Sequence, residues 1–125
     1  MSLKKIFSKH SETHDQHKNK ELKTRYYKTT SKEALNILKN ICQQTLQATI
    51  HAISEERGEL SISIINEGKK AFVVASVVMV QPYQTAIDFT VTTETAFPFD
   101  FGYSTKVIKS LYDALDQRLP LLETN

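Results

Sequence analysis

Apolar residues recur at helical spacing in two stretches of the chain and at alternating positions in the segments between them. The first helical stretch opens with Thr30-Ser31-Lys32-Glu33, a capping-box pattern in which Thr30 is the N-cap and Glu33 reaches back to its amide. It extends to about residue 44. The second stretch runs from about residue 103 to residue 118, and Pro120 ends it because proline cannot continue a helix. We therefore predict two amphipathic helices.

Four strand-like segments lie between the helices, at residues 46–54, 59–65, 70–81 and 85–95. Gly58, Gly68 and Pro82 stand in the breaks, as expected for turns. A further short strand is expected within residues 22–28. The order (β)-α-β-β-β-β-α predicts an α+β fold, a four-stranded antiparallel meander with both helices packed on one face.

The alternation of apolar residues assigns the faces of these strands, because successive side chains point to opposite sides of a sheet. In segments 59–65 and 85–95 the apolar positions form one set, which we expect to face the helices: Leu60, Ile62, Ile64, Ile87, Phe89 and Val91. A loop of two or four residues at Pro82-Tyr83 then adds to this core face Phe72, Val74, Ser76 and Val78. Three-residue loops ending at Gly58 and Gly68 bring the other strands into agreement, with Ile50 and Ala52 on the same face.

The opposite side of segment 70–81 is also apolar, and this stripe predicts an interface. Its members are Ala71, Val73, Ala75, Val77 and Met79, bordered by the hydroxyl residues Ser61, Ser63, Thr90 and Thr92. Such a pattern is typical of a surface that becomes covered. We predict a symmetric homodimer packed sheet to sheet through this face. Cover by the chain's own N-terminal segment is the alternative.

Composition narrows the classes of function. With 125 residues the chain has room for one domain, and we expect a flexible polar segment at residues 1–20 followed by a single domain at 21–125. A formal net charge of +2 is too small to indicate a nucleic-acid partner. The longest apolar run, residues 71–80, is about half of the roughly 20 residues that a membrane-spanning helix needs. The single cysteine, Cys42, fits a reducing, cytoplasmic location.

Three histidines in the N-terminal segment form a candidate metal site. His10, His14 and His17 are spaced i, i+4 and i+7, which would place them on one face of a helix. Three imidazoles suit Zn²⁺, Ni²⁺ or Cu²⁺. The alternative is that they are solvated residues of a polar tail. We expect no bound cofactor, and the chain carries no phosphate loop, dinucleotide fingerprint or nucleophile elbow, which counts against an enzyme.

The segment 97–103 alternates aromatic residues with proline, aspartate and glycine. Phe97, Phe99, Phe101 and Tyr103 could line a pocket for an apolar ligand, with Asp100 as its polar anchor. In the alternative interpretation the rings plug the end of the core, while Asp100 or Ser104 caps the following helix.

Three stretches resemble a known family: Leu22-Lys23-Thr24-Arg25-Tyr26-Tyr27, Ser54-Glu55-Glu56-Arg57-Gly58-Glu59 and Pro98-Phe99-Asp100-Phe101-Gly102-Tyr103. They are similar to small cytosolic proteins of Gram-positive, Bacillus-type bacteria that have no assigned function. The resemblance implies no activity, cofactor or functional residue. The order of elements is also loosely similar to helix-grip lipid-binding folds, which have more strands.

We therefore expect a non-enzymatic interaction module that self-associates through one sheet face. The alternative is a carrier of a small apolar ligand or lipid, with a pocket between the helices and the sheet that is floored by Phe72 and Phe89. An enzyme is the third hypothesis.

Overall fold

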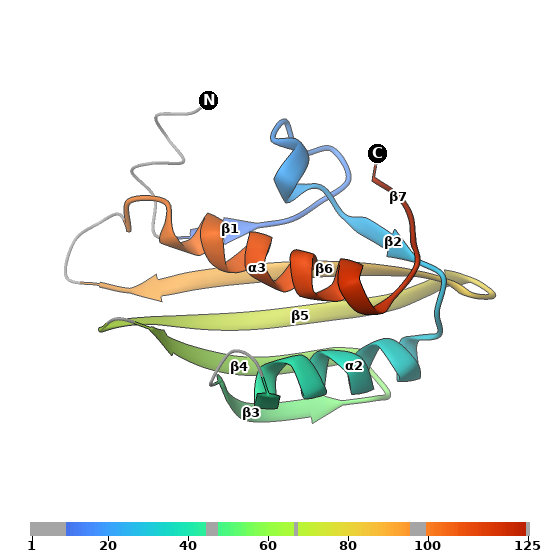
Figure 1. The fold of residues 1–125 in the computed structure, drawn as a ribbon, viewed down its shortest axis with the longest axis horizontal. Coiled ribbons are helices and arrows are strands. Elements are labelled where there is room, and N and C mark those ends of the chain that lie inside the picture. The colour runs from blue at the N-terminus through green and yellow to red at the C-terminus, as the bar shows by residue number, and fades with distance from the viewer. Residues whose placement is uncertain (1–9, 45–47, 67, 96–99, 125) are drawn as a thin grey trace.

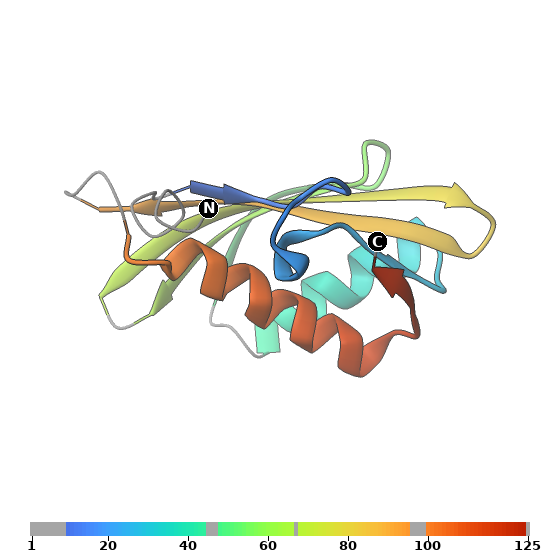
Figure 2. The ribbon, with the colours of Figure 1, turned by 90° about the horizontal axis from the view of Figure 1, so that it is seen from above.

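A computed structural model of the chain describes residues 10–44, 48–66, 68–95 and 100–124. The helices are α2 (Ser31–Gln44) and α3 (Tyr103–Arg118), with a short 3-10 turn η1 (Lys20–Leu22). The strands are β1 (His10–Glu12), β2 (Arg25–Tyr27), β3 (Ala48–Ser54), β4 (Glu59–Asn66), β5 (Lys69–Gln81), β6 (Gln84–Glu94) and β7 (Leu121–Thr124). Both helices lie on the same side of one antiparallel sheet (Figures 1 and 2), which confirms the α+β class and the expected order of elements.

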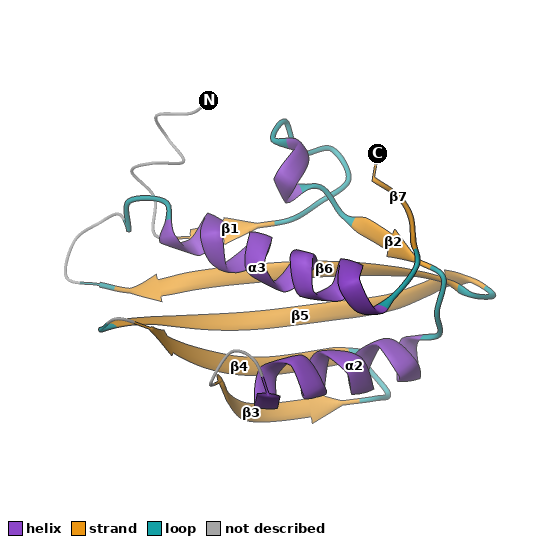
Figure 3. Cartoon of the chain, viewed as in Figure 1, coloured by secondary structure: helices purple, strands orange, loops and turns teal. Residues whose placement is uncertain are grey.

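The sheet is wider than the predicted meander. Its strands follow the order β3-β4-β5-β6-β2-β7, and β1 also pairs with β6 (Figure 3). Strands β3 to β6 are the meander, and the three short strands extend it beyond β6. Among the described strands, β3 therefore forms one edge of the sheet, and β1 and β7 form the other.

β1 and β2 pair with successive parts of β6 and are separated by an excursion of the chain. Glu12 lies opposite Thr90, and Arg25 lies opposite Ile87. The chain therefore advances thirteen residues from Glu12 to Arg25 while the paired position on β6 moves by only three residues. Ten additional residues leave the sheet, and this excursion includes Leu22, which is fully buried. Residues 10–20 are therefore not part of a flexible segment, contrary to the expectation for residues 1–20: residues 10–12 pair with β6, and Ser11 and Thr13 are buried. The buried apolar residue of the excursion, Leu22, follows this range. Residues 1–9 lie outside the described part of the chain.

The core faces of β4 and β6 are as predicted. Their apolar residues are buried beneath the helices together with the apolar faces of α2 and α3. The amide of Glu33 donates to Thr30 Oγ1 at 3.2 Å, so Thr30 is the expected N-cap. The Glu33 carboxylate, however, accepts from the hydroxyl of Thr29 rather than from the Thr30 amide.

The predicted face assignment of β5 is wrong. Ala71, Val73, Ala75 and Val77 are buried beneath the helices, whereas the residues expected in the core, Phe72, Val74 and Val78, are exposed on the other face. Pro82 and Tyr83 form a two-residue turn, one of the two expected lengths, with Gln81 opposite Gln84. The register then shifts between Met79 and Gln81, so Val80 is an extra residue without a partner in β6. This bulge exchanges the two faces of the sheet for every residue of β5 that precedes Val80.

The two earlier hairpins also differ from the prediction, in the lengths of their turns. Asn66 pairs with Lys69 across a two-residue turn instead of the expected three. Ser54 pairs with Glu59 across a four-residue turn, and the β3 register shifts again between Ile50 and Ala52. As a result Ile50 packs against the core as predicted, whereas Ala52 is exposed.

Candidate functional site

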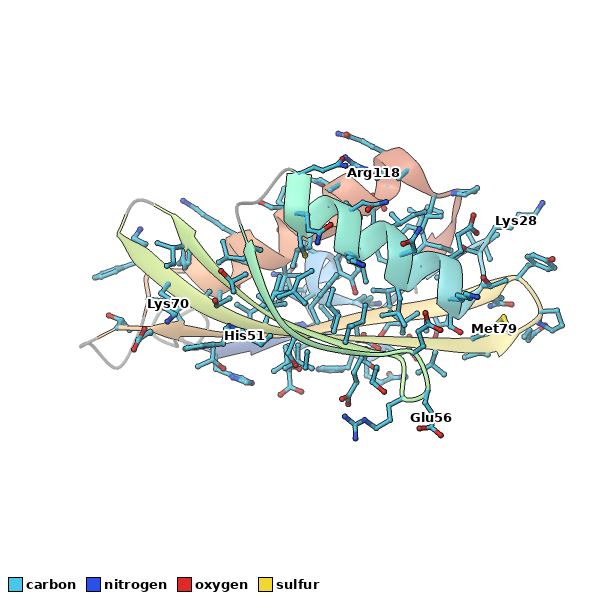
Figure 4. All side chains as sticks on the ribbon, turned by 90° about the horizontal axis from the view of Figure 1, so that it is seen from below. Lys28, His51, Glu56, Lys70, Met79 and Arg118 are labelled. Carbon is cyan, nitrogen blue, oxygen red and sulfur yellow. The ribbon has the colours of Figure 1, made fainter. Side chains whose placement is uncertain are left out.

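The face of the sheet turned away from the helices carries an apolar strip in its middle. On β5 the outward positions are Phe72, Val74, Ser76 and Val78, and the three apolar side chains are 43%, 40% and 51% exposed. A sheet with one solvated face normally carries polar residues at such positions. The labelled His51 side chain in Figure 4 lies on this same face, opposite the helices. Three apolar side chains of β5 are thus left on the outer face.

Hydroxyl residues flank this strip on both neighbouring strands. Ser61 of β4 and Thr90 of β6 lie opposite Val74, and Ser63 and Thr92 lie opposite Phe72. We define the open-face patch as these uncharged residues of three adjacent strands: Ser61, Ser63, Phe72, Val74, Ser76, Val78, Thr90 and Thr92. Depletion of charge is the compositional signature of the centre of a protein interface.

Charged groups lie at the margin of the open-face patch. Glu59 and Asp88 flank Ser76, while Glu94 lies opposite Lys70 at the other end. Asp88 Oδ1 accepts from the hydroxyls of Thr13 and Thr24, at 2.6 Å in both cases. These bonds hold the carboxylate between the end of β1 and the start of β2.

Two histidines contact hydroxyls of the open-face patch. His51 Nε2 lies 3.0 Å from Ser63 Oγ, and His10 Nδ1 lies 2.8 Å from Thr92 Oγ1. His10 Nε2 is also 3.4 Å from Glu12 Oε2. Hydroxyl, imidazole and carboxylate here follow the order of a hydrolytic triad. The side chains of His10 and Glu12 are, however, 46% and 59% exposed on a strand surface, where water competes for each contact, so we interpret them as surface hydrogen bonds.

The structure does not bring His10, His14 and His17 onto one helical face, so the predicted arrangement for a metal site is wrong. His10 belongs to β1, where side chains alternate. The rings of His14 and His17 are 4.8 Å apart, and His17 Nδ1 accepts from the amide of Asn19 at 3.0 Å. Among the described residues there is no group of three potential metal ligands from His, Cys, Asp and Glu.

In the aromatic loop, Phe97 and Phe99 lie outside the described residues. Asp100 is buried, and its carboxylate accepts from the Thr93 hydroxyl at 2.6 Å, the Ser104 amide at 3.0 Å and the Gly102 amide at 2.9 Å. Asp100 therefore accepts from an amide in the first turn of α3, as the alternative interpretation expects, although the N-cap position itself is Gly102. Tyr103 is nearly buried beneath the Lys69 ammonium, whereas Phe101 is 68% exposed, so these two rings do not line a common pocket.

A polar network inside the domain leaves no recognisable pattern in the sequence. Arg25 Nη1 donates to Asp116 Oδ2 at 2.6 Å, and the Tyr27 hydroxyl donates to Oδ1 of the same carboxylate at 2.6 Å. The guanidinium also stacks 4.5 Å from the centre of the Tyr112 ring. Burial, reinforced by the neighbouring carboxylate, raises the pKa of Tyr27 far above its usual value. The network joins β2 to α3. The short strand expected within residues 22–28 does not indicate Asp116 as the partner of Arg25 and Tyr27.

The pocket of the carrier hypothesis loses one of its predicted residues. Phe89 is buried, and its ring packs edge to face with that of Tyr112, with the ring centres 5.0 Å apart. Phe72 lies on the opposite face of the sheet. The two phenylalanines therefore cannot floor one pocket between the helices and the sheet.

Comparison with known proteins gives no family. No protein-family model matches the chain, and no curated protein matches it. The resemblance to small proteins of Gram-positive bacteria thus stays a prediction. None of the described helices is both long and apolar enough to cross a membrane.

Proposed function

We propose that this chain is a non-enzymatic, cytoplasmic interaction module that self-associates through the open-face patch. The observation that carries the proposal is the exposure of Phe72, Val74 and Val78 at outward positions of a central strand. A sheet presents these side chains at fixed spacing, so they lose little conformational freedom when they are covered. Burying them removes apolar surface from water, at roughly 25 cal/mol for each Å².

The arrangement of charges favours a second copy of the chain as the partner. Sheets that pack face to face through a two-fold axis perpendicular to the strands at Val74 bring Phe72 over the partner's Ser76. Ser61 and Thr90 lie in the same row as Val74, so uncharged residues meet at the axis. The Asp88 carboxylate then faces the threonine end of the other sheet instead of its own copy.

The oligomeric state tests the proposal. The expected result is a dimer of the full chain at about 50 µM, a concentration at which micromolar dissociation constants populate the complex. Val74→Glu should give a folded monomer, because it places a carboxylate at the axis. Ile53→Glu is the matched control, since Ile53 is 45% exposed but lies at the β3 edge on the helix side. Sedimentation velocity that finds the wild type monomeric, or both variants equally monomeric, contradicts the proposal.

A further inference from the structure

A groove lies between α2 and the edge strand β3, apart from the open-face patch. Its volume is about 600 Å³, and its apolar surface includes Leu35 and Ile53. Lys32, Asn36 and Lys39 line the side formed by α2, and Glu55 stands beyond the end of β3. Leu35 is buried, whereas Ile53 is 45% exposed. The groove thus lies beside the C-terminal end of β3, and Ile53 supplies its exposed apolar surface.

The β3 edge lacks the side chains that usually block an edge strand. In the described part of the chain β3 pairs with β4 alone, so its other side presents backbone donors and acceptors. Its seven residues, Ala48–Ser54, include no charged residue and no proline. The register shift near His51 is its one irregularity. A strand of this kind can accept a further strand.

The charges of the groove indicate what such a strand should carry. Lys32, Asn36 and Lys39 are spaced i, i+4 and i+7 on one face of α2. Neither lysine forms an ion pair within the described residues. Two carboxylates also line the groove: Glu33, in the first turn of α2, accepts from the Thr29 hydroxyl, and Glu55 stands beyond the end of β3. The positive charge of the groove is therefore confined to the two lysines on α2. Pairing of β3 with a second copy brings two identical lysine rows together, which is unfavourable.

We propose that this groove binds an extended acidic peptide segment of a partner protein, which adds to the sheet as a strand beside β3. Every second side chain of the segment enters the groove. An apolar side chain there contacts the exposed Ile53, and a carboxylate two residues away faces Lys32 or Lys39. The backbone of β3 supplies affinity, and the two lysines supply the preference for acidic sequences.

A nuclear magnetic resonance titration with two synthetic probes tests this site. The first probe is a blocked Thr-Glu-Thr-Val-Thr-Glu-Thr peptide, and the second carries lysine in place of both glutamates. The acidic peptide should produce saturable shifts of the β3 amides with a dissociation constant below about 1 mM. The basic peptide should bind at least about tenfold more weakly, a difference of about 1.4 kcal/mol. The double variant Lys32→Glu, Lys39→Glu should reverse the order of the two peptides.

Further variants separate this site from the self-association proposed above. Val74→Glu should leave peptide binding unchanged, whether or not the chain dimerises through the open-face patch. Ile53→Glu should weaken binding of the acidic peptide. Absence of saturable shifts at about 5 mM acidic peptide, equal binding of both peptides, or shifts centred on β7 overturns the proposal. So does conversion of a wild-type dimer to a monomer by Ile53→Lys, because the β3 edge would then be a contact between copies.

Discussion

Val77 lies opposite Ile87 in the ladder between β5 and β6, and both side chains are buried beneath the helices. The neighbouring Val78 points to the other face and is half exposed. The unpaired Val80 decides this arrangement, because one extra residue exchanges the two faces of the whole strand. With this parity the small residues Ala71 and Ala75 lie beneath the helices, and Phe72 remains outside.

Glutamate substitutions at two positions of β5 test which face of the sheet each side chain occupies. Val77→Glu places a carboxylate in the apolar core and should cost several kcal/mol, a large part of the about 5–15 kcal/mol that stabilises a small domain. Val74→Glu places the same group on the open face and should change the monomer's free energy of unfolding by less than about 1 kcal/mol. Urea unfolding at low protein concentration measures both. A stable, fully folded Val77→Glu variant contradicts the observed register.

The elements and the core residues of β4 and β6 follow from the sequence because their alternation is regular and the flanking turns carry glycine or proline. The sequence does not determine which side of β5 faces the helices, because both of its sides are apolar. Only the lengths of the flanking turns indicate its register. A bulge at Val80 leaves no mark on the sequence pattern. The excursion between β1 and β2 was missed for a related reason: its anchor Leu22 stands alone in a polar stretch, and periodicity needs repeated residues.

Alkaline pH should destabilise the domain through its buried tyrosines. The pKa of Tyr27 and of Tyr112 is raised from 10, chiefly by burial. Above pH 10 the unfolded chain loses these protons while the folded chain keeps them, so stability falls as the pH rises. Each tyrosine should contribute a loss of up to about 1.4 kcal/mol for each pH unit. Burial also raises the pKa of Cys42 from 9.0 to about 11. Between these pH values the thiol ionises in the unfolded chain but not in the folded one, so the free energy of unfolding falls further.

Chemical unfolding at pH 8, 10 and 11 measures this dependence. Tyr27→Phe removes one titrating group and should flatten the slope above pH 10, even if it lowers stability at pH 8 by removing the bond to Asp116. Tyr83→Phe is the control, because Tyr83 is exposed at a turn and should leave the slope unchanged. An identical slope in Tyr27→Phe and the wild type is the outcome against this account.

Gly58 is required by a close approach of two backbone segments. Its φ is 67°, and an added Cβ would lie 2.2 Å from the carbonyl oxygen of Val77. The amide of Val77 also donates to the Gly58 carbonyl at 2.7 Å, so neither segment can move apart freely. Gly58→Ala should therefore cost about 1–3 kcal/mol or more.

Gly68→Ala is the matched control for that substitution. Gly68 has a φ of 80°, but no atom lies within 4 Å of the position of an added Cβ. Only the backbone strain of a left-handed alanine remains, about 1 kcal/mol. Thermal unfolding should rank the variants as wild type, Gly68→Ala and Gly58→Ala, in order of falling stability. An equal loss in the two variants means that the clash with Val77 is relieved without cost.

Truncation at two points tests the role of the N-terminal segment. Removing residues 1–20 deletes β1 and with it the bonds of Thr13, whose amide donates to Phe89 O while its hydroxyl accepts from the Phe89 amide and donates to Asp88. It also deletes Ser11, whose buried hydroxyl lies 2.9 Å from that of Ser104 on α3. Half of the β6 edge is left unpaired, and an unpaired edge promotes aggregation. This truncated chain should be several kcal/mol less stable or insoluble.

Removing residues 1–9 deletes none of these bonds, so the free energy of unfolding should fall by less than about 1 kcal/mol. This shorter truncation also distinguishes the two occupants considered for the open face. If a second copy covers the open-face patch, the truncated and full-length chains should both sediment as dimers, and Val74→Glu should make both monomeric. If residues 1–9 cover it instead, the full chain sediments as a monomer and only the truncated chain associates. In that case Phe72, Val74 and Val78 belong to an intramolecular contact, and the proposal of self-association fails.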